Sequence, residues 1–131
     1  MNCVLLADRH HELSEGVRGL LETTFDKVFM VADQGSLMDG AERLRPEVIV
    51  VDLSFAGGDL AGFLRKLGQR APNAKLLLLS VHDEPTVTSF VLAAGADGVV
   101  LTRSIATDLL AAIDAILAGQ RFVSPAVMTS R

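Results

Sequence analysis

The feature that most constrains the fold is an alternation of two kinds of segment along the chain. Each short apolar run of strand length is followed by a longer segment in which apolar residues recur every three or four positions, as on one face of a helix. The apolar runs are Cys3–Ala7, Val28–Ala32, Val48–Val51, Leu76–Leu79 and Val99–Leu101. Because parallel strands need long crossover connections, the alternation predicts five parallel strands with helices on both faces.

The helical segments are bounded by residues that end helices. Pro46, Pro72, Gly95 and Gly119 follow the second, third, fourth and fifth segments. Proline cannot continue a helix, and glycine readily adopts the backbone conformation that closes one. The predicted architecture is therefore a doubly wound (βα)5 sheet.

Composition narrows the class of protein. A chain of 131 residues can bury one continuous core as a single domain. Its apolar runs are too short to cross a bilayer, which takes about 20 residues. The single cysteine, Cys3, lies in an apolar run and no secretory signal opens the chain, so we expect a cytoplasmic location. The net charge of −4 argues against binding of DNA by this segment alone.

Polar residues that could carry chemistry follow four of the apolar runs directly. They are Asp8–His11, Asp52–Ser54, Ser80–Glu84 and Thr102–Ser104. In open parallel sheets, ligands bind at the carboxyl ends of the strands, where these loops meet. We therefore expect the carboxylates of Asp8 and Asp52 and the hydroxyl of Ser80 to face one crevice.

In their order and context these residues resemble the receiver domain of two-component response regulators, and in detail the NarL/LuxR subgroup. The resemblance covers almost the whole chain. It rests on Val4–Asp8 with His10, on Pro46–Ser54, on Ala93–Leu101 and on Ala118–Pro125. It implies a flavodoxin-like (CheY-like) sheet with strand order 2-1-3-4-5, and a signalling module rather than an enzyme.

The resemblance also implies a role for each matching residue. Asp52 would be the phosphoacceptor, its carboxylate attacking the phosphorus of a group supplied by a histidine kinase. Asp8, Asp52 and the backbone carbonyl of Ser54 would hold Mg²⁺, which prefers oxygen ligands. The Ser80 hydroxyl would sense the phosphoryl group by hydrogen bonding to it, and His82 would line the rim of the pocket.

Three positions depart from the family pattern. Arg9 stands where a second acidic residue is usual, Thr102 where a lysine is usual, and Val99 where an aromatic switch residue is usual. Arg9 removes a ligand and adds a positive charge, so we expect Mg²⁺ to bind weakly. Two interpretations of Arg9 remain open: its guanidinium replaces the missing lysine as a donor, or it points to solvent.

The valine at position 99 affects what we expect of the signalling surface. The resemblance implies that this surface is formed by the fourth helix, the fifth strand and the fifth helix, and that an aromatic side chain couples it to the pocket. Valine is too short to make that movement. We therefore expect a muted response to phosphorylation, or a conformation already biased toward one state.

The resemblance implies a receiver domain over residues 1–120, and a tail over 121–131 that begins a linker to an absent helix-turn-helix output domain. The leading hypothesis is a phosphoacceptor that controls transcription through that domain, with a possible homodimer. DNA would be contacted only through the output domain, and no membrane partner is expected. The alternative is an atypical pseudo-receiver, a phosphorylation-independent interaction or dimerisation module.

Overall fold

The computed structural model describes residues 3–9 and 11–129 of the chain. Over these residues it contains six strands and six α-helices. The strands are β1 (Cys3–Ala7), β2 (Lys27–Val31), β3 (Val48–Asp52), β4 (Lys75–Ser80), β5 (Gly98–Leu101) and β6 (Phe122–Val123). The α-helices are α1 (His11–Leu21), α2 (Gln34–Leu44), α3 (Leu60–Arg70), α4 (Pro85–Ala93), α5 (Ile105–Leu117) and α6 (Pro125–Thr129). Two 3₁₀ turns, η1 (Leu53–Ala56) and η2 (Thr102–Ser104), follow β3 and β5.

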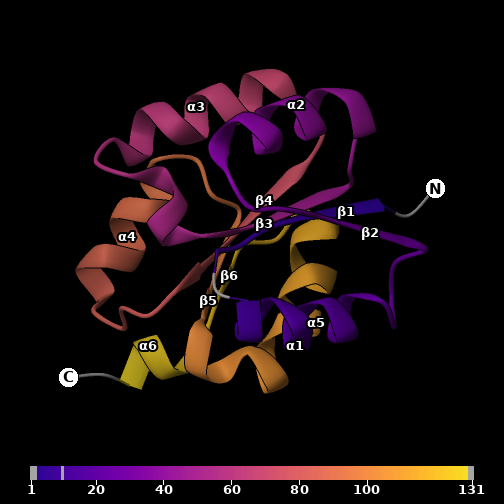
Figure 1. The fold of residues 1–131 in the computed structure, drawn as a ribbon. Coiled ribbons are helices and arrows are strands. Elements are labelled where there is room, and N and C mark those ends of the chain that lie inside the picture. Colours follow the sequence, from indigo (N-terminus) through magenta and orange to yellow (C-terminus); the bar gives the residue numbers. More distant parts are fainter. Residues whose placement is uncertain (1–2, 10, 130–131) are drawn as a thin grey trace.

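The strands form one parallel sheet in the order β2-β1-β3-β4-β5-β6 (Figure 1). The predicted order of the first five strands is confirmed. The sixth strand corrects the prediction of five, because Phe122 and Val123 pair with Gly98 and Val99 of β5. A strand of only two residues is too short for the alternation of apolar segments to reveal.

Helices cover both faces of the sheet. Successive strand residues point to opposite faces, so Leu5 and Ala7 of β1 pack under α2 and α3 while Val4 and Leu6 pack against α1 and α5. Helix α4 lies on the same face as α2 and α3, and its Val91 joins their core (Figure 1). This two-sided burial explains why the strand sequences are apolar at every position rather than at alternate ones.

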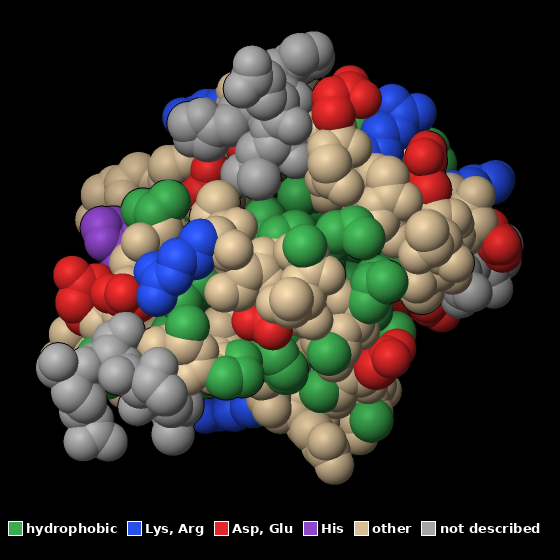
Figure 2. Space-filling view, turned by 90° about the horizontal axis from the view of Figure 1, so that it is seen from below, with side chains coloured by type: hydrophobic (Ala, Val, Ile, Leu, Met, Phe, Trp, Pro, Cys, Tyr) green, Lys and Arg blue, Asp and Glu red, His purple; other side chains and the backbone are tan. Residues whose placement is uncertain are grey.

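The face that carries α1, α5 and α6 is seen in Figure 2. Hydrophobic side chains gather in the middle of this face, and charged side chains lie mainly toward its margins. Partly exposed apolar residues on these helices include Leu20, Leu110 and Leu117. Among residues 3–9 and 11–129, no helix is both long enough and apolar enough to cross a membrane.

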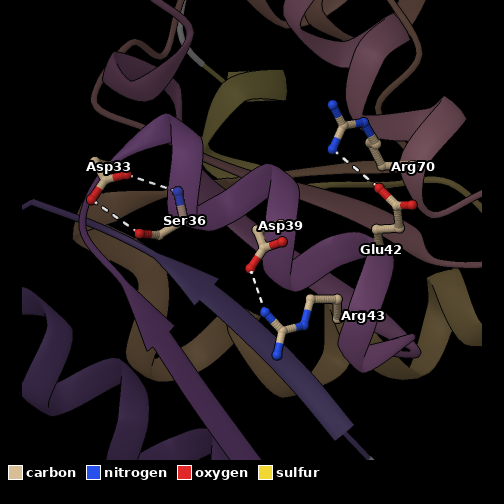
Figure 3. Close-up of polar contacts among 6 residues, drawn as sticks. All are labelled: Asp33, Ser36, Asp39, Glu42, Arg43 and Arg70. Atoms are coloured by element: carbon tan, nitrogen blue, oxygen red, sulfur yellow. Dashed lines mark hydrogen bonds and ion pairs between the residues drawn. The ribbon is translucent and has the colours of Figure 1, made fainter.

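Polar contacts fix the start of α2 and its position beside α3 (Figure 3). The Asp33 carboxylate caps α2, accepting from the Ser36 backbone N–H at 2.7 Å and from the Ser36 hydroxyl at 3.1 Å. Near the far end of the helix, Arg70 of α3 donates to Glu42 at 3.2 Å. Helix α2 ends at Leu44, ahead of Pro46 as expected.

Candidate functional site

Two buried carboxylates stand side by side at the carboxyl edge of the sheet. Asp8 directly follows β1, Asp52 ends β3, and the two strands are neighbours with Ala7 opposite Val51. Asp8 is 6% exposed and Asp52 is 8% exposed. The prediction that these two residues meet in one place is consistent with this register. Buried carboxylates are ordinarily paired or bound to metal ions, so two of them at one edge of the sheet mark a candidate binding site.

The chain turns immediately after Asp52. One carboxylate oxygen of Asp52 accepts a hydrogen bond from the Ser54 backbone N–H at 3.2 Å, which caps the 3₁₀ turn η1. Ser54 is exposed on this turn, and Gly57 ends it with a φ of 67°, a conformation that favours glycine. The turn therefore holds the Ser54 backbone against the Asp52 carboxylate.

Arg9 lies against an aromatic ring. Its guanidinium carbon stands 4.7 Å from the centre of the Phe55 ring, although the residue as a whole is exposed. Phe55 is fully buried in η1, and its carbonyl accepts a hydrogen bond from Gln34. A guanidinium over a ring face is a favourable cation–π arrangement. Neither interpretation offered for Arg9 included this contact, because sequence spacing does not show that η1 passes beneath the residue.

The charge of Arg9 also acts on Asp33, which lies between β2 and α2. The pKa of the Asp33 carboxyl is lowered, first by the hydrogen bonds from Ser36 and to a smaller extent by the positive charge of Arg9. Asp33 is the N-cap residue of α2, so the charge of Arg9 acts on the start of that helix. Arg9 directly follows Asp8 in the sequence, and its guanidinium lies over Phe55 in the turn that follows Asp52.

Ser80 ends β4 and is 1% exposed. In the register of the sheet Asp52 is opposite Leu79, so Ser80 lies one residue beyond the level of Asp52. Its hydroxyl accepts from the His82 backbone N–H at 2.9 Å and donates to the His82 carbonyl at 3.3 Å. The His82 side chain is exposed, and its Nδ1 lies 3.8 Å from Glu84. The Ser80 hydroxyl is thus held by its own loop in this structure.

The usual lysine position is taken by Thr102, the first residue of η2 after β5. The next residue, Arg103, forms an ion pair with Asp83 of the β4–α4 loop, with 3.1 Å between Nη2 and Oδ2. A cavity of about 210 Å³ lies between the two loops, lined by Ser80, Leu101, Thr102 and their neighbours. The cation next to the lysine position therefore joins two loops. No local sequence pattern pairs Arg103 with Asp83.

Val99, at the position of the expected aromatic residue, is 1% exposed. It packs with Val91 of α4 and Ala96 in the core on that side of the sheet. His10, which contributed to the sequence motif, lies outside the described residues.

The donor set fits a magnesium ion with few protein ligands. Mg²⁺ prefers oxygen, keeps several waters, and is commonly held by one or two carboxylates. Asp8 and Asp52 supply buried carboxylates at adjacent strand ends, and the Ser54 carbonyl is close in sequence. Over the described part of the chain, no group of three or more His, Cys, Asp and Glu side chains is placed to hold a metal. The described residues therefore offer two acids, Asp8 and Asp52, at this edge of the sheet.

Comparison with known proteins agrees with this geometry. The family model of the response regulator receiver domain matches residues 4–114. The transcriptional regulatory protein DegU of Brevibacillus brevis is 30% identical over 126 residues, covering 95% of this chain and 53% of the relative. RcsB of Escherichia coli is 28% identical over 129 residues, covering 95% of this chain and 60% of the relative. The chain thus spans little more than half the length of these curated relatives.

Solved structures give the same result. A two-component response regulator of the LuxR family from Aurantimonas sp. SI85-9A1 superposes with a TM-score of 0.85 at 29% identity, covering 97% of this chain and 92% of that one. Receiver domains generally bind Mg²⁺ at their phosphorylation site. From its fold, its paired acids and these matches, the chain belongs to the response regulator receiver domain family.

Proposed function

We propose that the chain is a phosphoacceptor whose acceptor is Asp52. The observation that supports this most is the burial of Asp52 at the end of a central strand, beside Asp8 and one strand away from Ser80. A carboxylate oxygen of Asp52 attacks the phosphorus of a phosphohistidine on a histidine kinase. The phosphorus–nitrogen bond breaks, the imidazole leaves with the electron pair, and an acyl phosphate forms on Asp52.

The residues around Asp52 would serve that transfer in different ways. Mg²⁺, when bound, neutralises charge on the transferring group. Asp8, Asp52 and the Ser54 carbonyl would hold it. The Ser80 hydroxyl, in leaving His82, would donate to a phosphoryl oxygen, and the exposed His82 ring would border the path of water to the acyl phosphate. Arg9 lowers the affinity for Mg²⁺, because it contributes positive charge where a ligand is usual.

The chain would act as the input part of a longer regulator. We infer a receiver domain over residues 1–120 that controls a DNA-binding domain joined through the segment after it. Supporting this, DegU and RcsB are transcriptional regulatory proteins of which this chain covers only 53% and 60%, and one solved structure holds two RcsB dimers bound to two parallel DNAs. A homodimer, a histidine kinase partner, contact with DNA only through the output domain, and a cytoplasmic location belong to this proposal.

The experiment that tests the acceptor is an intact-mass measurement after incubation with a small phosphodonor and Mg²⁺. One phosphoryl group should add to the wild type and none to Asp52→Asn. An adduct that persists in Asp52→Asn would contradict the assignment.

A second candidate is a pseudo-receiver that acts without phosphoryl transfer. The contacts of the two cations favour it: Arg9 stacks on Phe55, and Arg103 pairs with Asp83. Both contacts join loops at the carboxyl ends of the strands in the unmodified protein, without a phosphoryl group. Absence of any adduct on the wild type, together with unchanged self-association in the presence of phosphodonor, would favour this candidate.

Burial of Val99 supports a muted response at the α4–β5–α5 surface. A Val99→Tyr variant would supply the missing aromatic side chain. Amide chemical shifts over residues 87–118, recorded with and without a beryllofluoride adduct, should change more in that variant than in the wild type. An equally large change in the wild type would contradict this inference.

A further inference from the structure

The C-terminal segment 122–129 is attached to the sheet by main-chain hydrogen bonds. The Phe122 N–H donates to the Asp97 carbonyl at 3.3 Å, and the Ser124 N–H donates to the Val99 carbonyl at 3.1 Å. Gly98 makes the close approach possible, because a Cβ there would lie 3.2 Å from the Phe122 carbonyl oxygen. The segment is therefore an added edge of the sheet, in contact with β5.

Ser124 extends this attachment beyond the end of β6. It is fully buried, and its hydroxyl oxygen accepts from the Leu101 N–H at 2.9 Å, in the place of a strand carbonyl. Its own carbonyl accepts from the Val127 N–H at 3.0 Å in the first turn of α6. Val127 is buried, and α6 packs on α4 (Figure 1). One buried serine thus joins the end of β5 to the helix that follows.

The end of β5 is also connected to the candidate site. Leu101 pairs with Ser80 across the sheet. Two residues later Arg103 is ion-paired with Asp83, which lies in the loop that holds the Ser80 hydroxyl. Leu101 therefore stands between the Ser80 loop on one side and Ser124 on the other. This connection runs through backbone and an ion pair, and it does not use Val99.

We propose that the segment 122–129 is the element that reports modification of Asp52 in this chain. This rests on the proposed function. When Ser80 leaves His82 for the phosphoryl group, the β4–α4 loop moves with Asp83 and α4. The Arg103–Asp83 pair carries that movement to η2, the Leu101 N–H separates from Ser124, and α6 loosens from α4. The output is the release of the segment.

Amide hydrogen exchange tests the proposal on the chain with and without beryllofluoride and saturating Mg²⁺, with the adduct verified by mass. Exchange over residues 122–129 should become about five- to tenfold faster in the adduct, the effect of losing about one net hydrogen bond. Strands β1 and β3 should not change. Absence of the adduct would overturn the proposed function and this proposal with it. An adduct without faster exchange in the segment would overturn this proposal alone.

Two variants test the proposed connection from the Arg103–Asp83 ion pair through Leu101 to Ser124. Ser124→Ala removes the acceptor of the Leu101 N–H, so the unmodified protein should already show the faster exchange. Ser89→Ala, at an exposed serine of α4, is the matched control and should leave exchange unchanged. Asp83→Asn removes one charge of the ion pair, so the adduct should form with a smaller response in the segment. If exchange over residues 122–129 were unchanged in unmodified Ser124→Ala, or increased as much in the Asp83→Asn adduct as in the wild-type adduct, the proposed connection would be overturned.

Discussion

The two halves of the carboxyl edge of the sheet differ in what holds them. At β1 and β3, buried acids lie together and the neighbouring cation, Arg9, stacks on an aromatic ring. At β4 and β5, a buried hydroxyl is held by its own loop and the neighbouring cation, Arg103, is ion-paired to Asp83. The first half has the groups for binding and chemistry. The second has the connections through which a movement can spread.

In both halves an arginine lies close to the candidate site residues: Arg9 directly follows Asp8, and Arg103 follows Thr102. Arg9 adds charge beside a ligand pair, so its effect should be on ion binding. Arg103 joins two loops through a partly exposed ion pair, so its effect should be on coupling and hardly on stability. The same residue type thus serves two purposes, which the substitutions below separate.

The largest effect is expected at Asp52. Asp52→Asn keeps the shape of the side chain but removes the nucleophilic charge, so phosphorylation by a small phosphodonor should be lost entirely. Ser80→Ala should still accept the group, because the hydroxyl lies in the other half of the site. Intact-mass measurement of both variants distinguishes the halves. Equal loss in the two variants would contradict the division of roles.

Arg9→Asp should tighten Mg²⁺ binding by at least about tenfold, since it removes a positive charge and restores an oxygen ligand. Calorimetric titration measures the affinity directly. Arg121→Asp, at an exposed site in the segment between α5 and β6, is the control for net charge alone. If the affinity for Mg²⁺ rose equally in both variants, Arg9 would act through the overall charge of the protein rather than as a neighbour of the ion.

Phe55→Leu should destabilise the fold by about 1–2 kcal/mol through lost packing. It should cost a further ~0.5–1 kcal/mol through the lost contact with Arg9. Phe63→Leu removes a ring from the same core without that contact. Urea unfolding of the two variants gives the difference. Should Phe63→Leu cost as much as Phe55→Leu, the stacked guanidinium would contribute nothing measurable.

The smallest effect concerns Asp33. Hydrogen bonds from Ser36 come before the charge of Arg9 among the causes that lower its pKa. Ser36→Ala keeps the backbone hydrogen bond and removes the hydroxyl one, which still comes before the charge of Arg9, so it should raise this pKa more than Arg9→Gln does in an NMR titration of the carboxyl carbon. A lowered pKa stabilises the folded state above the unfolded pKa, and the stabilisation is lost as pH falls through the folded pKa. A larger shift in Arg9→Gln would show that the guanidinium faces Asp33 more closely than Phe55.

Most of the architecture could be predicted from the sequence, because the spacing of apolar residues and the Pro and Gly residues at helix ends are local signals. Apolar runs predicted β1 to β5, and Pro46 and Gly95 lie just past the ends of α2 and α4. The meeting of Asp8 with Asp52 followed from the rule that carboxyl ends of parallel strands share one edge. β6 was missed because its two residues lie between a glycine turn and a serine–proline step, with no run to detect.

The contacts of the two arginines could not be predicted for a different reason. Phe55 is 46 residues from Arg9, and Asp83 is 20 residues from Arg103. Each pair depends on where a loop passes after leaving its strand, and residue spacing does not contain that information. The hydrogen bond between Ser124 and Leu101 is of the same kind, since it requires β6 to be in place first.

The short strand β6 has a further consequence for solubility. It covers the main-chain groups of Val99 and Leu101 that would otherwise form an open sheet edge, and open edges are templates for association with other chains. A chain cut after residue 120 would keep the five long strands but expose this edge. Such a fragment should aggregate more readily than the chain that extends to residue 129, although its acids and its Ser80 loop would be untouched.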